Sequence, residues 1–588
     1  MSNRQGTLKT LSKSVRGNRA VSVATVFCSM AEVVFEIVIP ICMSNLLDKG
    51  IQSGDMSAVW RYGAELLGLA ALAMTTGILA ARIGARASVG LAANLREDMY
   101  RNVQTFSFSN IDKFSTSSIV TRLTTDVTNV QNAYQMMLRI AVRGPAMLVF
   151  AMIVSFRISP DISRIFFIAI PVLGIPLALI SKGEHPIFTK VFRTYDKLNN
   201  IVQENVRGIR VVKSFNQEQH EIDKFHSVSE DIRSNFTKAE KILAFNSPLM
   251  QLCMYTCMIL ISWFGAKAIV ASGNDAALGL TTGNLTALST YATQILMSLM
   301  MLSMVFSMII ISQASARRIA EILNEKADIS NPSSPVMEVK DGSIDFDHVD
   351  FVYASKADKK VLSNIDVHIK SGETIGIIGG TGSSKTSLVQ LIPRLYDVTG
   401  GSLSLGGVNV KDYDLEVLRS SVAMVLQKNE LFSGTIKENL RWGNEDATDE
   451  QLEQACRLAC AHEFISAIPN GYDTYIEQGG VNVSGGQKQR LCIARALLSQ
   501  PKVLILDDST SAVDTHTDAL IQKALSQYMP QTTKLVITQR ISSVQNADRI
   551  IVMDDGCINA IGKHDELLKT CEIYREVYES QQKGDSKE

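Results

Sequence analysis

A glycine-rich stretch in the second half of the chain carries the residues best suited to chemistry. It reads Ile-Gly-Ile-Ile-Gly-Gly-Thr-Gly-Ser-Ser-Lys-Thr-Ser over residues 375–387. An isoleucine-rich run that ends in glycines predicts a buried strand and then a tight turn. The Leu-Val-Gln-Leu-Ile run over residues 388–392 predicts a helix after the turn. In such a strand–loop–helix, backbone N–H groups and the positive helix end face a phosphate.

The side chains of this loop have separate predicted roles. Lys385 would reach the terminal phosphates of a nucleotide, and the Thr386 hydroxyl would ligate Mg²⁺. Ser384 departs from the phosphate-loop pattern, because glycine usually stands before the lysine. Taken alone, the stretch could also be an ordinary glycine-rich turn. The loop residues assigned to nucleotide binding are Gly379, Gly380, Thr381, Gly382, Ser383, Ser384, Lys385, Thr386 and Ser387.

Two later stretches fit the same chemistry. The apolar run Val-Leu-Ile-Leu over residues 503–506 predicts a strand buried on both faces, and Asp507 follows it. A carboxylate at such a strand end is placed to hold Mg²⁺. Between the two motifs, Ser484 precedes two glycines and a helical run that ends at Leu498. Serine is a natural helix N-cap, and the glycines let backbone N–H groups approach an anion.

The first half of the chain, which precedes these motifs, has the pattern of a membrane domain. It contains six apolar stretches of roughly bilayer length, at residues 21–47, 62–81, 140–158, 163–181, 246–272 and 286–311. The connections on one side are short and carry few basic residues, whereas the two long connections on the other side are rich in arginine and lysine. Because positive charge marks the cytosolic side, both ends of the chain are expected in the cytoplasm. The long connections have helical patterns, which predicts membrane helices that continue into the cytosol.

Several charged residues lie inside the predicted spans. Glu32 and Glu36 are four residues apart, so they share one face of the first helix. An intramembrane carboxylate suggests a path for a cation or a substrate, although a polar contact between packed helices would explain the pair equally well. Arg139 and Arg143 form a similar pair near the inner end of the third span, and we expect them to extend to the interface.

Composition excludes some functions. The chain has 588 residues, and 58 basic residues balance 59 acidic ones, which argues against a nucleic-acid partner. None of its nine cysteines forms a C-x-x-C pair, so we expect free thiols and no metal cluster. The composition changes near residue 320, and a segment with two prolines follows. We therefore expect a membrane domain over residues 1–320, a linker over 321–341 and a soluble domain over 342–588.

With these motifs in order, the chain resembles the ATP-binding-cassette exporters over essentially its whole length. Six spans followed by one cassette match the half-transporter layout of that family. The resemblance implies an all-α transmembrane domain of six long helices fused to an α/β P-loop nucleotide-binding domain. In this family, two cassettes pair head to tail, so each ATP lies between one chain's phosphate loop and the other chain's signature motif. The turns near residues 108–118 and 205–213 look like the family's coupling helices.

The resemblance also assigns single positions. Tyr353 looks like the aromatic residue that stacks on adenine, Gln427 like the Q-loop glutamine, and residues 511–514 like the D-loop. Outside the phosphate loop, the implied nucleotide-binding residues are Tyr353 and the signature residues Ser484, Gly485, Gly486 and Gln487. The implied Mg²⁺ ligands are Thr386, Gln427 and Asp507.

Two positions depart from the family at the groups that drive hydrolysis. The family has a catalytic glutamate where this chain has Asp508, and a switch histidine where it has Gln539. Aspartate is shorter by one methylene, and a general base must lie within about 2.6–3.2 Å of the proton that it takes. Glutamine can bind a γ-phosphate but has no ionisable proton. The implied catalytic positions are therefore Gln427, Asp508 and Gln539. Because both Asp508 and Gln539 are altered, the chain resembles the degenerate half of a heterodimeric multidrug exporter.

We interpret the chain as one subunit of an ATP-driven exporter of amphipathic or lipophilic compounds in a bacterial inner membrane. It would use ATP and Mg²⁺ and pair with a second half-transporter chain, whose competent site would use this chain's signature motif. Two alternatives stay open. One is a homodimer with a slow ATPase. The other is a regulatory nucleotide-binding membrane subunit, or a channel, that moves nothing by hydrolysis.

Overall fold

The computed structural model describes residues 2–274, 279–353, 360–509 and 512–585. These residues form two compact units. The first unit contains Met1–Thr105 and Ser115–Glu325, and the second contains Phe106–Phe114 and Lys326–Glu588. The second unit therefore includes a short segment from the first half of the chain.

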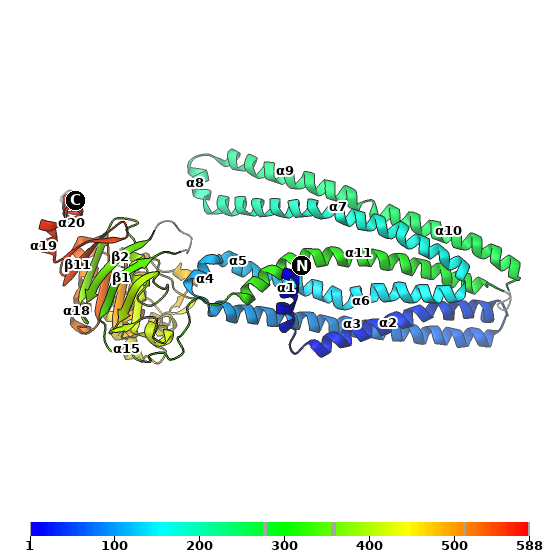
Figure 1. The fold of residues 1–588 in the computed structure, drawn as a ribbon, viewed down its shortest axis with the longest axis horizontal. Helices are drawn as coiled ribbons and strands as arrows, with labels where there is room; N and C mark the ends of the chain where they lie inside the picture. The colour runs from blue at the N-terminus through cyan, green and yellow to red at the C-terminus, as the bar shows by residue number, and fades with distance from the viewer. Residues whose placement is uncertain (1, 275–278, 354–359, 510–511, 586–588) are drawn as a thin grey trace. The chain divides into compact units, whose positions relative to one another are not determined.

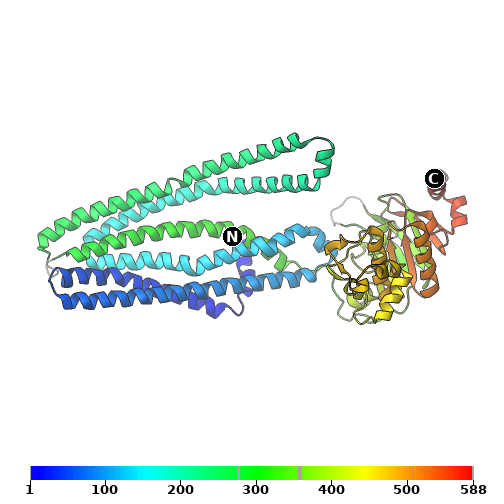
Figure 2. The ribbon, with the colours of Figure 1, turned by 180° about the vertical axis from the view of Figure 1, so that it is seen from behind.

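The first unit consists of helices, most of them long and side by side (Figures 1 and 2). Six of its helices are long and apolar enough to cross a membrane, as the sequence predicted. The described helices of this unit are α1 (Ser2–Lys13), α2 (Arg19–Asn45), η1 (Leu46–Ile51), α3 (Met56–Gln104), α5 (Thr116–Thr121), η2 (Arg122–Asp126), α6 (Val127–Ile158), α7 (Pro160–Arg207), α8 (Ile209–Ser214), α9 (Glu218–Leu243), α10 (Asn246–Ser272) and α11 (Thr282–Asn324).

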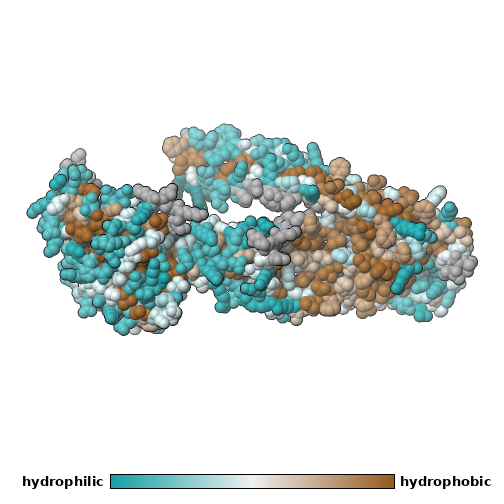
Figure 3. Space-filling model, in the orientation of Figure 1, coloured by the Kyte–Doolittle hydropathy of each residue, from teal (hydrophilic) through white to brown (hydrophobic). Residues whose placement is uncertain are grey.

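Apolar side chains cover only part of the length of these helices. Figure 3 shows a hydrophobic zone along the helices α2, α3, α6 and α10 on the side away from α8, and a mainly hydrophilic surface over the ends of α7 and α9 that adjoin α8, with apolar side chains at α8 itself. Large apolar residues such as Leu67, Ile259 and Trp263 are strongly exposed in the apolar zone, as expected of a surface that faces lipid. Helix α3 runs unbroken for 49 residues, which confirms that the membrane helices extend beyond the apolar zone.

The second unit is an α/β domain with a predominantly parallel sheet. Its six strands have the order β12-β11-β3-β10-β9-β6, and all neighbours pair in parallel except β11 and β12. Buried residues pack against both faces of this sheet, which explains the continuous apolar runs of its central strands. The strands are β3 (Thr374–Gly379), β6 (Val422–Val425), β9 (Val503–Asp507), β10 (Thr533–Ile537), β11 (Arg549–Asp554) and β12 (Cys557–Gly562).

Smaller elements complete the domain. A second sheet has the antiparallel order β2-β1-β4-β5, and β7 pairs with β8. These strands are β1 (Ile344–Phe351), β2 (Leu362–Ile369), β4 (Gly400–Leu405), β5 (Val408–Asn409), β7 (Gly434–Thr435) and β8 (Tyr475–Ile476). The helices are α12 (Lys385–Gln390), α13 (Leu415–Ser421), α14 (Ile436–Arg441), α15 (Asp449–Leu458), α16 (His462–Ala467), α17 (Gly485–Leu498), α18 (Thr515–Tyr528), α19 (His564–Thr570) and α20 (Glu572–Asp585), with the 3-10 turns η3 (Gly471–Asp473), η4 (Gln478–Gly480) and η5 (Ile541–Ser543).

The short helix α4 (Phe108–Lys113) packs within the second unit, at the turn that sequence placed in the cytosol. The Tyr396 hydroxyl donates to Asp112 Oδ2 at 2.7 Å, and the ring of Phe108 lies 6.0 Å from the ring of Tyr396. Burial, followed by the hydrogen bond to Asp112, raises the pKa of Tyr396. A capping box between Ser107 and Asn110 begins the helix. A turn between two membrane helices is thus bound to the α/β domain through a tyrosine.

Candidate functional site

The phosphate loop lies between β3 and α12, as predicted. Gly382 (φ +86°) and Ser384 (φ +69°) both have left-handed backbone conformations, and Ser384 stands directly before α12. Glycine adopts this conformation freely, whereas a residue with a Cβ pays roughly 1–2 kcal/mol for it. The serine that replaces glycine in the pattern therefore stands where glycine would be less strained.

The loop is packed closely on one side and open on the other. A Cβ on Gly379 would lie 2.3 Å from the Met553 carbonyl oxygen and 2.6 Å from Ser383 Oγ, so only glycine fits there. A Cβ on Gly380 would meet nothing within 4 Å. The open side of the loop therefore has room for an anion beside the N-terminal end of α12.

Lys385 Nζ lies across the loop. It donates to the carbonyl oxygens of Gly379 and Gly380, each at 2.8 Å, and to Ser383 Oγ at 3.1 Å. Burial lowers the pKa of Lys385, while the nearby Asp507 and Asp508 oppose the shift. A phosphate in the loop would offer this ammonium group a charged partner in place of the neutral carbonyls.

Parallel strands bring the predicted hydrolytic residues to the same place. The carboxyl ends of β3, β10, β9 and β6 lie next to one another at one sheet edge, where α/β proteins bind ligands. A cavity of about 300 Å³ opens at this edge. Its lining contains most of the predicted loop residues together with Gln427, Asp507, Asp508 and Gln539. Residues scattered over more than 150 positions therefore line one cavity.

Asp507 is buried at the end of β9. Its carboxylate accepts a hydrogen bond from the Thr386 hydroxyl. Burial raises the pKa of Asp507, and the Thr386 hydrogen bond partly offsets that rise. The Thr386 hydroxyl, the Asp507 carboxylate and the Gln427 amide oxygen are the hard oxygen donors that Mg²⁺ prefers.

Asp508 has a left-handed backbone (φ +46°), and its N–H donates to the Ile537 carbonyl oxygen at 2.9 Å. This bond joins the end of β9 to the end of β10, directly before Thr538 and Gln539. The Gln427 Nε2 group donates to Asp508 Oδ2 at 3.4 Å, the long end of the hydrogen-bond range. Burial raises the pKa of Asp508, although Gln427 and the positive charges of Arg540 and Lys385 oppose the shift.

Tyr353, the proposed adenine platform, lies near the phosphate loop. Its hydroxyl lies 2.7 Å from Ser387 Oγ, so the tyrosine is joined to the first turn of α12. Its ring packs edge-on against Phe351 and Tyr396, with centroids 4.8 Å and 5.0 Å away. About 44% of Tyr353 is exposed, which leaves part of the ring open to stack on a base.

The signature residues begin α17. The Ser484 side chain accepts from the Gln487 N–H, and the Gln487 side chain accepts from the Ser484 N–H, a capping box that confirms the predicted N-cap. A Cβ on Gly485 would lie 3.6 Å from Ala512 Cβ, whereas one on Gly486 would lie 2.8 Å from the Ala512 carbonyl oxygen. The signature loop therefore packs against the D-loop segment.

Of the D-loop residues, Ser511 lies outside the described residues, and Ala512, Val513 and Asp514 are described. Sequence reasoning missed two residues that bind this segment. Gln489 Oε1 accepts from the Ala512 N–H at 3.0 Å, and Arg540 Nη1 donates to the Val513 carbonyl oxygen at 3.1 Å. The available signal was their position in the sequence, Gln489 two residues after the signature motif and Arg540 directly after Gln539.

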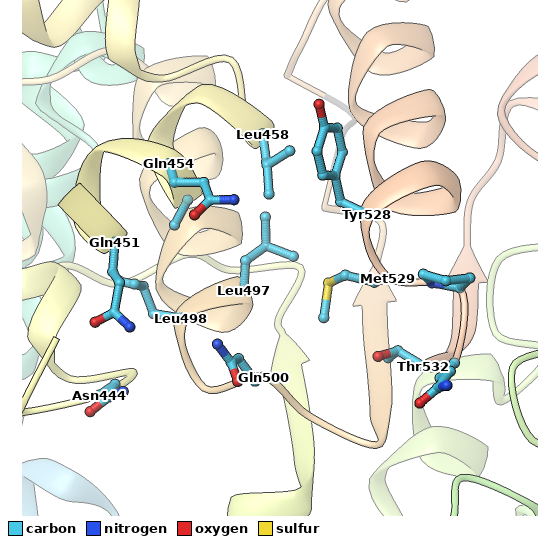
Figure 4. Close-up of a pocket in the computed structure, with 13 residues that line it drawn as sticks. Asn444, Gln451, Gln454, Leu458, Leu497, Leu498, Gln500, Tyr528, Met529 and Thr532 are labelled. Carbon is cyan, nitrogen blue, oxygen red and sulfur yellow. The ribbon is translucent and has the colours of Figure 1, made fainter. Parts of the chain in front are cut away.

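A larger cavity of about 460 Å³ lies elsewhere in the second unit, between α15, α17 and the end of α18. The side chains of Leu458, Leu497 and Met529 converge on it, and several glutamine amides surround them (Figure 4). None of the described residues that line it is charged, and none belongs to the predicted motifs. Its size therefore does not make it the nucleotide site.

Glu32 and Glu36 of α2 pair with Arg143, which the sequence analysis had placed at the membrane interface. Arg143 Nη2 donates to both carboxylate oxygens of Glu36, at 2.7 Å and 2.9 Å, and Nη1 lies 3.3 Å from Glu32 Oε1. The expectation that Arg143 extends to the membrane interface is therefore wrong. Two carboxylates inside the unit hold the guanidinium there, since an unpaired charge at that depth would be far more costly.

Comparison with known proteins decides the family. The description "ABC transporter transmembrane region" matches residues 22–300, and "ABC transporter" matches residues 362–511. The uncharacterized ABC transporter ATP-binding protein YfiB of Bacillus subtilis (strain 168) is 36% identical over 552 residues, which cover 94% of this chain and 95% of the relative. The chain belongs to the ABC transporter family. The predicted family is thereby confirmed.

Two further comparisons concern export. The ATP-dependent lipid A-core flippase of Desulfotalea psychrophila is 32% identical to this transporter over 545 residues, which cover 92% of this chain and 93% of the flippase. The solved structure of a bacterial Atm1-family ABC exporter with ATP bound has the same fold, with a TM-score of 0.82 at 22% identity, over 96% of this chain and 99% of that chain. This transporter is therefore a multi-pass half-transporter with the exporter fold and an ATPase domain, which confirms the predicted fold class.

Proposed function

We propose that this transporter is the degenerate-site subunit of a heterodimeric exporter of amphipathic or lipophilic compounds. It would lie in the inner (plasma) membrane, with its cassette and both ends of the chain in the cytoplasm. In functional terms, residues 1–320 form the membrane domain, residues 321–341 the linker and residues 342–588 the cassette. The first unit of the fold ends within that linker, at Glu325.

The observation that carries this proposal is the chemistry of the nucleotide cavity. Asp508 and Gln539 both line it, at the positions where hydrolysis needs a general base and a switch residue. Because aspartate is one methylene shorter than glutamate, its carboxylate lies farther from the position where a water would be activated. A misplacement of about 1 Å can cost on the order of a hundredfold in rate. Gln539 can hydrogen-bond a γ-phosphate but cannot supply or accept a mobile proton in the way that histidine does.

In contrast to the hydrolytic positions, each group that the family resemblance assigns to nucleotide binding has a candidate residue in this chain. Tyr353 would stack on adenine, Lys385 and the loop N–H groups would bind the phosphates, and Thr386, Gln427 and Asp507 would hold Mg²⁺. When bound, Mg²⁺ would neutralise phosphate charge. Binding energy and catalytic energy are separable, since only contacts that improve in the transition state accelerate hydrolysis. We infer a site in this chain that holds MgATP and hydrolyses it slowly.

Two surfaces support a partner chain. The signature residues Ser484, Gly485 and Gly486 would present donors to a phosphate bound by the partner's loop. In the first unit, α8 at the far turn of α7 and α9 exposes Val211 and Phe215, at 59% and 71%. Exposed apolar side chains on a hydrophilic end of a helical hairpin indicate a contact surface. A second cassette would cover it.

A homodimer with a slow ATPase is the second candidate, and one observation favours it. Burial raises the pKa of Asp508, which makes its carboxylate a stronger base than an exposed aspartate. A stronger base offsets part of the loss caused by its shorter reach. The ATPase rate of the purified chain, measured alone and together with a candidate second half-transporter chain, separates the two candidates. A heterodimer predicts that the partner raises the rate at least about tenfold, whereas a rate that the partner leaves unchanged favours the homodimer.

The substrate class rests on the membrane domain. The Desulfotalea psychrophila relative is named as a lipid A-core flippase, and a flippase substrate is amphipathic. In this chain, α2, α6 and α11 form a cavity of about 300 Å³ that combines Ile39, Met147 and Met297 with an ion pair. Methionine adapts its shape to different apolar ligands. Such a cavity suits a compound with an apolar body and a polar group.

A further inference from the structure

The ion cluster in the membrane domain has more negative than positive charge. Glu32 and Glu36 of α2 both contact Arg143 of α6, and Arg143 uses one nitrogen for each carboxylate. Two carboxylates and one guanidinium leave a net charge of minus one when all three are ionised. In a medium of low dielectric constant, that surplus attracts a cation strongly.

Two acceptors beside this cluster are unused. Among the described residues, neither Glu32 Oε2 nor Gln294 Oε1 has a hydrogen-bond partner, although both atoms are buried. Glu32 as a whole is 7% exposed. A Cβ on Gly77 of α3 would lie 2.9 Å from Glu32 Oε1, so the backbone of α3 closes one side of the carboxylate. A buried acceptor without a donor is costly, and a ligand that carries a donor would relieve that cost.

The cavity of α2, α6 and α11 gives a ligand access to Glu36 and to the unused acceptor of Gln294, whereas Glu32 lies behind Arg143, outside the residues that line it. Glu36, Arg143 and Gln294 line it together with Pro40, Met297 and Met301. The Glu32 carboxylate contacts the same guanidinium that lines the cavity. The cavity lining therefore combines an ion pair and an amide acceptor with mainly apolar residues.

We propose that this cavity binds a lipophilic cation that carries N–H donors, such as a primary ammonium or a guanidinium, with its charged group against Glu36. The inference rests on the proposed export function and names the substrate class of the membrane domain. As the cation binds Glu36, Arg143 keeps Glu32 as its partner, so neither positive charge is left unpaired.

Other ligand charges fit less well. An anion would meet two carboxylates, and Arg143 already donates to both oxygens of one of them. A quaternary ammonium group would satisfy the charge but has no N–H group for the unused acceptors. A neutral alcohol has a donor but gains nothing from the surplus negative charge. A primary amine, a quaternary ammonium and a neutral alcohol with the same apolar body therefore form one matched set of probes.

The experiment uses the complete transporter complex in lipid nanodiscs. Phenylbutylamine, its N,N,N-trimethyl derivative and phenylbutanol are compared as stimulators of ATPase activity, each relative to the basal rate of the same variant. In the unmodified complex, the amine should act at the lowest concentration. Glu36→Gln should raise the half-maximal concentration of the amine about tenfold or more and leave that of phenylbutanol within about twofold. Glu36→Asp keeps the charge and should restore most of the amine response.

Two more variants refine the assignment. Gln294→Leu removes a neutral acceptor, so it should reduce the preference for the amine over its trimethyl derivative. Glu65→Gln on α3 is the matched control, because Glu65 pairs with the exposed Arg61, accepts a weak hydrogen bond from Cys42 Sγ at 3.7 Å and lies outside the cavity. It should leave the basal rate and the amine response unchanged. Equal shifts for amine and alcohol in Glu36→Gln would overturn the proposal and favour a purely structural ion pair.

A binding measurement separates failure of this inference from failure of the proposed function. If the complex shows no ATPase activity, the export proposal fails. Equilibrium binding of tritiated phenylbutylamine to the purified complex still tests the cavity in that case. Binding that weakens about tenfold in Glu36→Gln and not in Glu65→Gln supports the cation site. Binding that does not change in either variant overturns it.

Discussion

The nucleotide cavity contains two groups of residues that match the family to different extents. In the site that we propose, the phosphate loop, Thr386 and Asp507 would provide the contacts for MgATP, and Ser384 departs from the phosphate-loop pattern. β9 and β10 are neighbouring strands, and Asp508 and Gln539 follow them at the positions where the family resemblance predicts the hydrolytic glutamate and histidine. Groups that share one cavity can therefore be tuned separately, because binding needs only ground-state contacts, whereas hydrolysis needs a base within hydrogen-bond reach of water.

The largest effect should come from the signature motif, which we propose serves the partner's site rather than this chain's own. Gly485→Asp would place a negative charge against a partner-bound phosphate, and we expect near-complete loss of ATPase activity in the heterodimer. Gly485→Ala is the matched control, because its Cβ would make only an ordinary 3.6 Å contact with Ala512 Cβ. Retention of more than about half of the activity in Gly485→Asp would contradict the assignment.

The next effect concerns nucleotide occupancy in this chain. Lys385→Ala removes the one ammonium group that lies across the loop, so photolabelling of this subunit by an azido-ATP analogue should fall about tenfold or more. Labelling of the partner subunit should change much less. Lys523→Ala, an exposed lysine on α18, serves as the control. Equal loss of labelling in both subunits would mean that the two sites cannot be treated separately.

Repair of the hydrolytic pair tests the other half of the comparison. Asp508→Glu combined with Gln539→His should raise hydrolysis at this site about tenfold or more, whereas each single repair should do little, because base and switch act as a unit. The rate is measured in a complex whose partner lacks its own catalytic base. Asp508→Asn in the natural complex should change turnover only modestly. If Asp508→Asn instead abolishes activity, Asp508 is a working base and the homodimer becomes the better interpretation.

The pH dependence of MgATP binding should be smaller but specific. Only the ionised Asp507 carboxylate binds a cation, so affinity is full above its pKa and falls as the pH drops through that value. Burial raises the pKa of Asp507, so the loss should begin at a higher pH than for an exposed aspartate. Titration of MgATP binding from neutral to mildly acidic pH measures it. Asp507→Asn should remove this dependence, and an unchanged profile in that variant would exclude Asp507 as its source.

The smallest effect should be on stability. Ser384→Gly removes a Cβ from a left-handed residue and should stabilise the cassette by roughly 1 kcal/mol or less, since the greater freedom of glycine in the unfolded chain offsets part of the gain. Thermal unfolding of the complex without nucleotide measures this change. Ser383→Gly, one position earlier, removes a hydroxyl that donates to the Gly380 carbonyl and should destabilise instead. A lower melting temperature for Ser384→Gly would show that its side chain has a stabilising contact.

Local signals in the sequence were sufficient for much of this fold. Three such signals are the apolar run before the phosphate loop, Ser484 before two glycines, and the apolar stretches of bilayer length. Each is defined by residues that are close together in the sequence. Strand, N-cap and span are decided over such short distances, and the structure has each of them at the predicted place. The sequence also placed Asp508 and Gln539 after two buried strands, and both residues lie there in the structure, while their roles in hydrolysis stay a prediction.

Tertiary structure alone decided the features that join distant parts of the chain. Arg143 is 107 residues from Glu36, and no local pattern announces that the guanidinium turns inward to two carboxylates. Tyr396 is likewise 284 residues from its partner Asp112 in α4. The left-handed backbone of Ser384 and Asp508 depends on how strand ends and helix starts pack. Such pairings depend on which helices and strands become neighbours in the fold. Elements become neighbours because whole surfaces are buried together, and a short stretch of sequence does not contain that information.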